Sequence, residues 1–159
     1  MQTSGAGDFD FIVGDWHVHH RRLEERLSGC TAWVEFEGTS TTRKILGGLG
    51  NLEDNALDPP DGAYRAVAMR AFDPEAGTWA IWWLDARRPH HLDVPVVGGF
   101  ENGTGLFYAE DMLDGRPITV RFTWFSHQTD TARWEQAFSD DGGDTWETNW
   151  MMDFVRKPA

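Results

Sequence analysis

Three histidines and two arginines follow a tryptophan near the start of the chain, in the segment GDWHVHHRR at residues 14–22. If this segment is a strand, His17 and His19 share one face, and such a His-x-His pair can hold zinc or iron. A third ligand would have to come from elsewhere, and none stands at a diagnostic spacing. We therefore predict no metal site and no cofactor, and expect both histidines on a solvated face, paired with glutamates. Glu24, Glu25, Glu35 and Glu37 are the candidates for that pairing; the last two, with His90 and His91, are also the candidates for a third ligand.

The opposite face of the same strand carries a different chemistry. If Trp16 points inward, Val18, His20 and Arg22 do so as well. An inward His20 could act as a general acid or base, and Arg22 could stabilise an oxyanion. A buried guanidinium needs an anionic partner, so Arg22 could instead hold a ligand carboxylate, in a way similar to small cytosolic lipid-binding barrels. The alternative is that the strand leaves the barrel near Arg22, which would then lie in water.

The elements that must position these residues read as many short strands separated by tight turns. Turn signals such as Asp114-Gly115 join successive strands, which favours an up-and-down antiparallel sheet. We predict an all-β, up-and-down antiparallel barrel of about nine or ten strands, because closure removes the sheet edges. Residues 47–62, rich in Gly, Asn, Asp and Pro, are predicted to form the longest loop. Besides residues 14–22, strands are predicted at residues 32–42, 64–72, 79–85, 96–101, 106–113, 117–125, 132–139 and 146–155.

Alternation within these strands predicts which side chains line the interior. The hairpin at Asp114-Gly115 aligns the apolar sets of its two strands, and the last two strands each carry an aromatic set, which includes Trp146. Trp82 and Trp83 occupy opposite faces, and the sequence leaves open which of them points inward. Residues 87–91 (RRPHH) form a basic loop that is either solvated or a lid over the barrel mouth. The predicted ligand-binding wall is Trp16, Val18, His20, Arg22, Phe107, Phe122, Trp124, Trp134, Gln136, Thr148 and Trp150.

Two motifs carry resemblances to known families. Gly14-Asp15-Trp16 resembles the Gly-x-Trp that opens the first strand of lipocalins and other calycin barrels, where a cation near the end of the last strand stacks on the Trp. Arg156 stands in that place here. The wider pattern of residues 8–16 is similar to the uncharacterised bacterial family DUF1579. The resemblance implies a calycin-like barrel with an internal cavity and implies no reaction. Residues 139–146 resemble the Asp-box hairpin of sialidases, which we interpret as structural.

Composition limits the function. The 159 residues fit one domain, and a formal charge of −12 argues against nucleic-acid and anionic-membrane partners. No signal peptide is visible, so a cytoplasmic location is expected. The leading hypothesis is a single barrel domain over residues 1–159 that binds a small hydrophobic or aromatic molecule. One alternative is a cofactor-independent isomerase, cyclase or lyase that uses His20, with Arg22, and so the enzyme question stays open. A second alternative is a haem-binding barrel resembling nitrobindin. The one protein partner that we consider is a second copy of the chain, in a homodimer.

Overall fold

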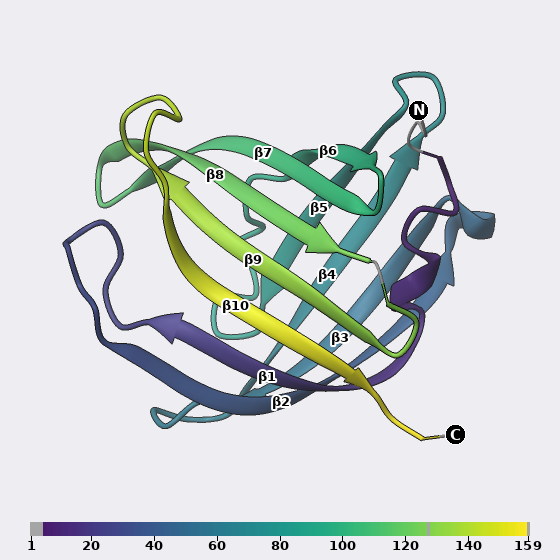
Figure 1. Ribbon diagram of the computed structural model, residues 1–159, viewed down its shortest axis with the longest axis horizontal. Helices are drawn as coiled ribbons and strands as arrows, with labels where there is room; N and C mark the ends of the chain where they lie inside the picture. Colours follow the sequence, from purple (N-terminus) through teal and green to yellow (C-terminus); the bar gives the residue numbers. More distant parts are fainter. Residues whose placement is uncertain (1–4, 127, 159) are drawn as a thin grey trace.

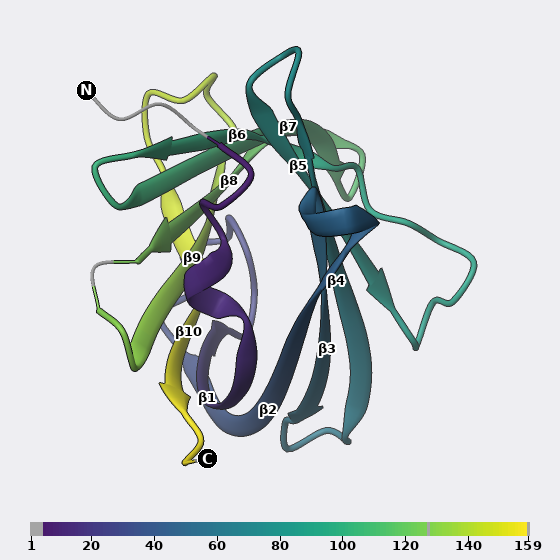
Figure 2. The same cartoon turned by 90° about the vertical axis from the view of Figure 1, so that its right-hand side faces the viewer.

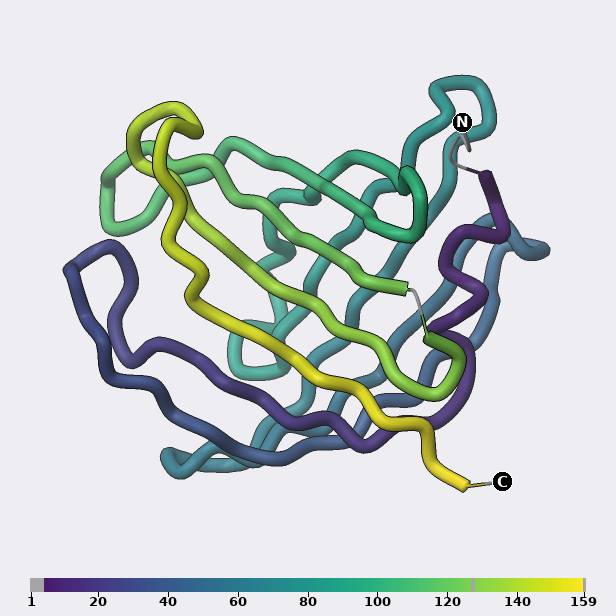
Figure 3. Tube along the Cα trace, in the orientation of Figure 1, coloured from purple at the N-terminus to yellow at the C-terminus, as the bar shows by residue number. Residues whose placement is uncertain are grey.

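The computed structural model describes residues 5–126 and 128–158, in which ten strands form one closed antiparallel barrel. Each strand pairs with the next along the chain, and β1 pairs with β10 to close the wall, as the chain trace makes plain (Figures 1 and 3). The predicted all-β, up-and-down barrel is therefore confirmed, with ten strands. They are β1 (Gly14–Leu23), β2 (Trp33–Ile45), β3 (Gly50–Asp58), β4 (Tyr64–Asp73), β5 (Thr78–Asp85), β6 (Val96–Glu101), β7 (Thr104–Leu113), β8 (Arg116–Phe125), β9 (Thr131–Ser139) and β10 (Glu147–Arg156).

Two short 3-10 helices accompany the strands: η1 (Asp10–Ile12) and η2 (Leu46–Gly48). Among the residues that the structure describes, no helix has the length and apolar character needed to span a bilayer.

The loop predicted over residues 47–62 is wrong, because nine of those residues form β3. Three of its inward residues are polar, since Asn51, Glu53 and Asn55 are all buried, and Leu57 is the apolar one. The usual alternation of apolar-inward and polar-outward residues is therefore missing, and turn-forming residue types dominate the composition. The strand is held by its pairing with β2 and β4, and Leu57 is its contribution to the hydrophobic core.

The buried polar face of β3 pairs with a cation from β4. Arg70 donates one hydrogen bond to Glu53 Oε1 over 2.5 Å and another to Asn51 Oδ1 over 2.8 Å. The side chains of Arg70 and Glu53 are 1% and 2% exposed. The guanidinium also lies against the rings of Phe9 and Trp124, with its carbon 4.9 and 5.0 Å from the two centroids. Aromatic packing and ion pairing thus act on the same buried guanidinium. Removal of either Arg70 or Glu53 would leave the other as an uncompensated buried charge.

One end of the barrel is closed by the N-terminal segment. Figure 2 shows this segment, with η1, lying between the two sides of the barrel. Phe9 packs edge-on against Trp79 and Trp124, at centroid separations of 4.9 and 5.8 Å, and stacks on Phe107 at 5.8 Å with the ring planes inclined by 27°. The indole Nε1 of Trp16 donates to the carbonyl of Ile12 over 2.9 Å, which ties η1 to the first strand. This half of the interior is packed with side chains.

The predicted contact between Arg156 and Trp16 is present at this closed end. The guanidinium carbon of Arg156 lies 4.2 Å from the centroid of the Trp16 ring. The same guanidinium donates to the carbonyl oxygens of Val13 over 2.9 Å and Phe11 over 3.0 Å. Gly14 leaves room for it: a Cβ at this position would lie 2.6 Å from Arg156, and the residue has a φ of 124°. The Gly-x-Trp spacing therefore serves the closure of the barrel end.

The hairpin at residues 139–146 has the structure that its Asp-box resemblance predicts. Asp141 accepts a hydrogen bond from the Thr145 amide over 2.9 Å and another from the Ser139 hydroxyl over 2.7 Å. Gly143 has a φ of 95°, and its carbonyl accepts from Trp146 Nε1 over 3.1 Å. The guanidinium of Arg121 stacks on the outside of Trp146, 4.2 Å from the ring centroid. The turn is thus structural, and the inward orientation predicted for Trp146 is wrong.

A β-bulge in β10 overturns a second predicted orientation. The register shifts between Thr148 and Trp150, so that Thr148 pairs with Ala137 and Trp150 with Gln136. Gln136 faces the interior; Ala137, the next residue, faces outward, and Thr148 lies on the outer face with it. The extra residue, Asn149, is fully buried, and its Oδ1 accepts a hydrogen bond from Gln136 Nε2 over 2.8 Å. Simple alternation fails here because the bulge inserts one residue.

Candidate ligand-binding cavity

The open half of the barrel contains a cavity of about 470 Å³. It lies beyond the packed end, where β1 finishes and β7 turns into β8. Its lining combines an aromatic and aliphatic interior with a charged rim. The lining residues are Arg22, Arg26, Tyr64, Ile81, Trp83, Asp85, Arg87, Arg88, His91, Asp93, Val94, Val96, Asp111, Met112, Leu113, Ile118, Val120, Phe122, Trp134, Gln136, Phe138 and Trp150.

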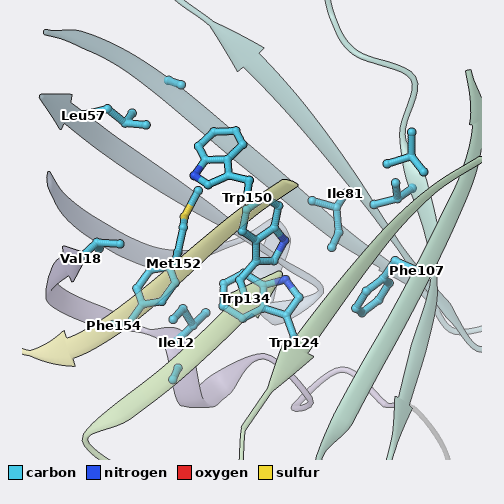
Figure 4. Close-up of a cluster of buried hydrophobic side chains, with 14 of the residues drawn as sticks. Ile12, Val18, Leu57, Ile81, Phe107, Trp124, Trp134, Trp150, Met152 and Phe154 are labelled. Carbon is cyan, nitrogen blue, oxygen red and sulfur yellow. The ribbon is translucent and has the colours of Figure 1, made fainter. Parts of the chain in front are cut away.

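Three indoles form the deep wall of the cavity. Trp134 meets Trp150 edge to face at a centroid separation of 5.2 Å, and Trp83 meets Trp150 in the same way at 5.8 Å. Figure 4 shows Trp134 and Trp150 grouped inside the barrel, next to Trp124 of the packed half. The choice between Trp82 and Trp83 is settled by register: Trp83 pairs with Ala68, which is buried, and it lines the cavity. Edge-to-face contacts fix the ring planes, so the wall is preorganised.

His20 points inward, as alternation predicts, but it does not line the cavity. Its ring stacks on Phe36 at a centroid separation of 4.6 Å and is 2% exposed. Nδ1 accepts a hydrogen bond from Nε1 of Trp150 over 3.1 Å. Burial, followed by the charge of Arg22, lowers the pKa of His20 from 6.5 to about 3. The imidazole is therefore neutral near pH 7, and its contact with Trp150 makes it a positioning residue for the cavity wall.

Arg22 projects into the cavity, which excludes the alternative that β1 leaves the barrel before it. Its Nη1 donates a hydrogen bond to the Tyr64 hydroxyl over 2.9 Å. Its guanidinium carbon lies 5.0 Å from the ring centroids of both Phe36 and Trp150. These two faces and one hydrogen bond hold the cation in a fixed orientation at the boundary between the aromatic wall and the rim.

A second arginine, Arg26, enters the cavity from the loop between β1 and β2, and sequence reasoning missed it. Its guanidinium carbon lies 5.4 Å from the centroid of the Phe138 ring. The loop is fastened next to it, because the Leu27 amide donates to Glu147 Oε1 over 2.7 Å. Burial and the neighbouring cation of Arg22 lower the pKa of Arg26, in that order of importance. No local pattern marks a loop residue that folds back into a barrel, so the sequence carried no signal for it.

The basic loop at residues 87–91 contributes to the rim, with Arg87, Arg88 and His91 in the lining. Arg87 pairs with Asp85 at 2.7 Å, and its guanidinium lies 3.5 Å from the centroid of the Tyr64 ring. The loop lies at the cavity mouth, where Arg87 is fastened by both contacts, and its residues are exposed to solvent as well.

Acidic groups face the cavity from the rim. Asp93 lies 3.5 Å from His91, and burial raises its pKa, with the Asp111 charge contributing in the same direction. Asp111 accepts a hydrogen bond from the Met112 amide over 2.7 Å. The rim therefore holds charges of both signs, although the whole chain is strongly acidic.

The predicted wall is thus divided along the barrel axis. Those of its members that line the cavity are Arg22, Phe122, Trp134, Gln136 and Trp150. Four others belong to the packed core of the molecule: Trp16, Val18, Phe107 and Trp124. His20 lies behind Trp150, and Thr148 lies on the outer face. Phe9 and Ile12 of the N-terminal segment belong to the same core cluster as these four residues, which do not line the cavity.

On the outer face of β1, His19 has the glutamate partners expected of a solvated strand, whereas His17 is exposed and has no ion pair within the described residues. His19 contacts Glu37 through Nδ1 at 2.7 Å and Glu35 through Nε2 at 2.9 Å. The hydrogen bonds from Glu37 and Glu35 raise the pKa of His19 above its usual value. Within residues 5–126 and 128–158, no group of three His, Cys, Asp or Glu side chains is placed to hold a metal ion.

Comparison with known proteins identifies the fold but no family. No family model and no curated protein matches the chain, so the resemblance to DUF1579 is not confirmed. The S-type phycobiliprotein lyase CPES from Guillardia theta is similar in structure, with a TM-score of 0.67. The two proteins share a fold. The match covers 99% of this chain and 95% of the lyase at 9% sequence identity, which supports a lipocalin-like barrel and leaves the activity open.

Proposed function

We propose that the protein binds a small, largely hydrophobic molecule in the cavity formed by the open half of the barrel. The observation that carries the proposal is a preformed space of about 470 Å³ walled by three indoles. Ligand sites of small molecules are usually concave, mostly apolar and within about 300–1,000 Å³, with a few polar groups that orient the ligand. Gln136 supplies such a group within the aromatic wall, and Arg22 supplies another where the wall meets the rim.

The shared fold is consistent with this proposal, since the similar structure, a phycobiliprotein lyase, has a barrel of the same fold. The pattern at residues 8–16 further leads us to infer membership in the uncharacterised bacterial family DUF1579.

A cofactor-independent reaction that uses His20 as acid or base is not favoured by the geometry. The ring lies behind Trp150, and its Nδ1 is already engaged by that indole. A haem-binding role would need a histidine that faces the cavity, and among the lining residues that histidine is His91, at the exposed rim. Both alternatives therefore lack a suitably placed group, whereas binding requires only the cavity itself.

A neutral fluorescent probe, N-phenyl-1-naphthylamine, tests the proposal by titration, with its emission and the tryptophan emission as readouts. Val120 lines the cavity, so Val120→Trp should fill it and weaken binding by about tenfold or more. Val155→Trp is the matched control, because Val155 is 54% exposed on the outside of the barrel. Circular dichroism should show both variants folded. Equal binding by the wild type and both variants would place the probe outside the cavity and contradict the proposal.

A further inference from the structure

Two cations reach the cavity without a carboxylate partner. Arg22 and Arg26 both line it, whereas its other well-placed cation, Arg87, is paired with Asp85. Within the described residues, the polar contact of the Arg22 guanidinium is the Tyr64 hydroxyl, a neutral acceptor. Arg26 makes no hydrogen bond and no ion pair there, and contacts the face of Phe138. Aromatic faces, one phenol and the more distant charges of Asp85 and Asp93 compensate these two cations only in part.

The acids of the rim are engaged elsewhere. Asp85 binds Arg87, Asp93 lies beside His91, and Asp111 accepts from a backbone amide. Four arginines and three aspartates line the cavity, so its lining is net positive even with a neutral His91, in a chain with a net charge of −12. A cationic pocket attracts a ligand of negative charge. The positive charge of this pocket cannot be explained by the composition of the chain, which is acidic overall.

The Arg22 guanidinium and the backbone beside Arg26 are held in place before any ligand arrives. Arg22 lies between Phe36 and Trp150, and the backbone next to Arg26 is fastened to Glu147. A preorganised cation such as Arg22 loses little conformational entropy on binding an anion, and a guanidinium matches the two oxygens of a carboxylate.

We propose that the ligand is a small hydrophobic carboxylic acid. Its carboxylate binds Arg22 and Arg26, and its apolar body lies against Trp83, Trp134 and Trp150. This inference rests on the proposed binding function and adds the chemical class of the ligand. It also assigns Arg26, a loop residue, to the binding site.

A matched pair of probes tests the charge: 1-pyrenebutyric acid and its methyl ester, which share one aromatic body and differ in the anionic group. Binding is measured through energy transfer from tryptophan to pyrene at neutral pH. The wild type should bind the acid about tenfold more tightly than the ester, as expected for charge-assisted hydrogen bonds. Arg26→Gln breaks no hydrogen bond of the described structure, so it should fold, lose most of this preference and bind the ester normally.

Arg26→Lys should keep part of the preference, since it retains the charge without the planar fork. Arg22→Gln should reduce it as well. Arg43→Gln removes an exposed cation of β2 and should leave it unchanged. Equal wild-type affinity for acid and ester would overturn the inference and leave the proposed function standing. A preference that survives both Arg26→Gln and Arg22→Gln would also overturn it. Failure of both compounds to bind would overturn the proposed function together with the inference.

Discussion

Nε1 of Trp150 donates a hydrogen bond to Nδ1 of His20 over 3.1 Å, which joins an indole of the cavity wall to an imidazole buried behind it. The bond requires an unprotonated Nδ1, in agreement with the lowered pKa of His20. The residue that looked most suited to acid–base chemistry in the sequence therefore acts through its neighbour.

This pairing predicts how stability depends on pH. The pKa of His20 falls from 6.5 in an exposed state to about 3 in the fold. Between these values the unfolded chain binds more protons than the folded one, so stability decreases as the pH drops from 6.5 towards 3. In His20→Gln, urea unfolding at pH 7, 6, 5 and 4 should show a slope shallower by up to about 1.4 kcal/mol per pH unit.

His19→Gln is the informative control, since the pKa of His19 is raised. The stabilisation that His19 contributes is complete below pH 6.5 and is lost as the pH rises through the folded-state pKa of His19. This pH dependence is opposite to that of His20. The effect should be small, because the pair is exposed to solvent. If His20→Gln and the wild type show the same slope, His20 does not carry the dependence.

The cation on Trp16 should stabilise the closed end of the barrel. Arg156→Ala removes the stacking contact, three hydrogen bonds to backbone carbonyls and an exposed ion pair with Asp130, so it should lower the free energy of unfolding by about 2 kcal/mol. Arg156→Lys should recover only part, because an ammonium cannot make the same fork. Urea denaturation measures both, with Lys157→Ala as the neighbouring control. An Arg156→Ala variant as stable as the wild type would show that the stacking adds nothing.

Gly14 should resist substitution for two independent reasons. Its φ of 124° is unfavourable for any side chain, and a Cβ would lie 2.6 Å from Arg156. Gly14→Ala should therefore destabilise the fold by about 2 kcal/mol or more. Combining Gly14→Ala with Arg156→Ala relieves the clash but not the strain, so the double variant should lose less than the sum of the two. Strict additivity in thermal or urea unfolding would argue against the clash.

The buried pair between Arg70 and Glu53 should show strong coupling. Glu53→Gln leaves a guanidinium without its counter-charge in a site that is almost fully buried, and should cost about 3 kcal/mol. Arg70→Met leaves a buried carboxylate and should cost a similar amount. The double variant should be more stable than the sum of both losses by more than about 1 kcal/mol in a double-mutant cycle. Additive losses would mean that the two side chains do not interact.

The orientation of the two adjacent tryptophans is open to test with a bound probe. Trp83 lines the cavity and Trp82 faces outward. Trp83→Phe should therefore reduce the quenching of tryptophan emission by N-phenyl-1-naphthylamine more than Trp82→Phe does. Equal effects of the two substitutions would contradict the assigned register of β5.

The local sequence pattern was sufficient to predict which face of the barrel wall most side chains occupy. Alternation predicted that Trp16, Val18, His20 and Arg22 point inward, because neighbouring side chains in a strand must face opposite sides. Turn chemistry at Asp114-Gly115 fixed the pairing of β7 with β8. The stacking of Arg156 on Trp16 followed from the Gly-x-Trp resemblance and not from spacing alone.

Only the tertiary structure decided what those inward residues surround. The sequence pattern did not predict β3 because Asn51, Glu53 and Asn55 on its buried face are polar, and Glu53 needs Arg70 from β4 as its partner. The bulge beside Asn149 sent Thr148 outward, and strand alternation contains no marker for an inserted residue. The N-terminal segment fills one half of the barrel, which separates Trp16 from the cavity, and the loop after β1 brings Arg26 into the other half. Alternation fixes the side of the sheet on which a residue lies, but depth along the barrel and its contents depend on segments distant in the chain.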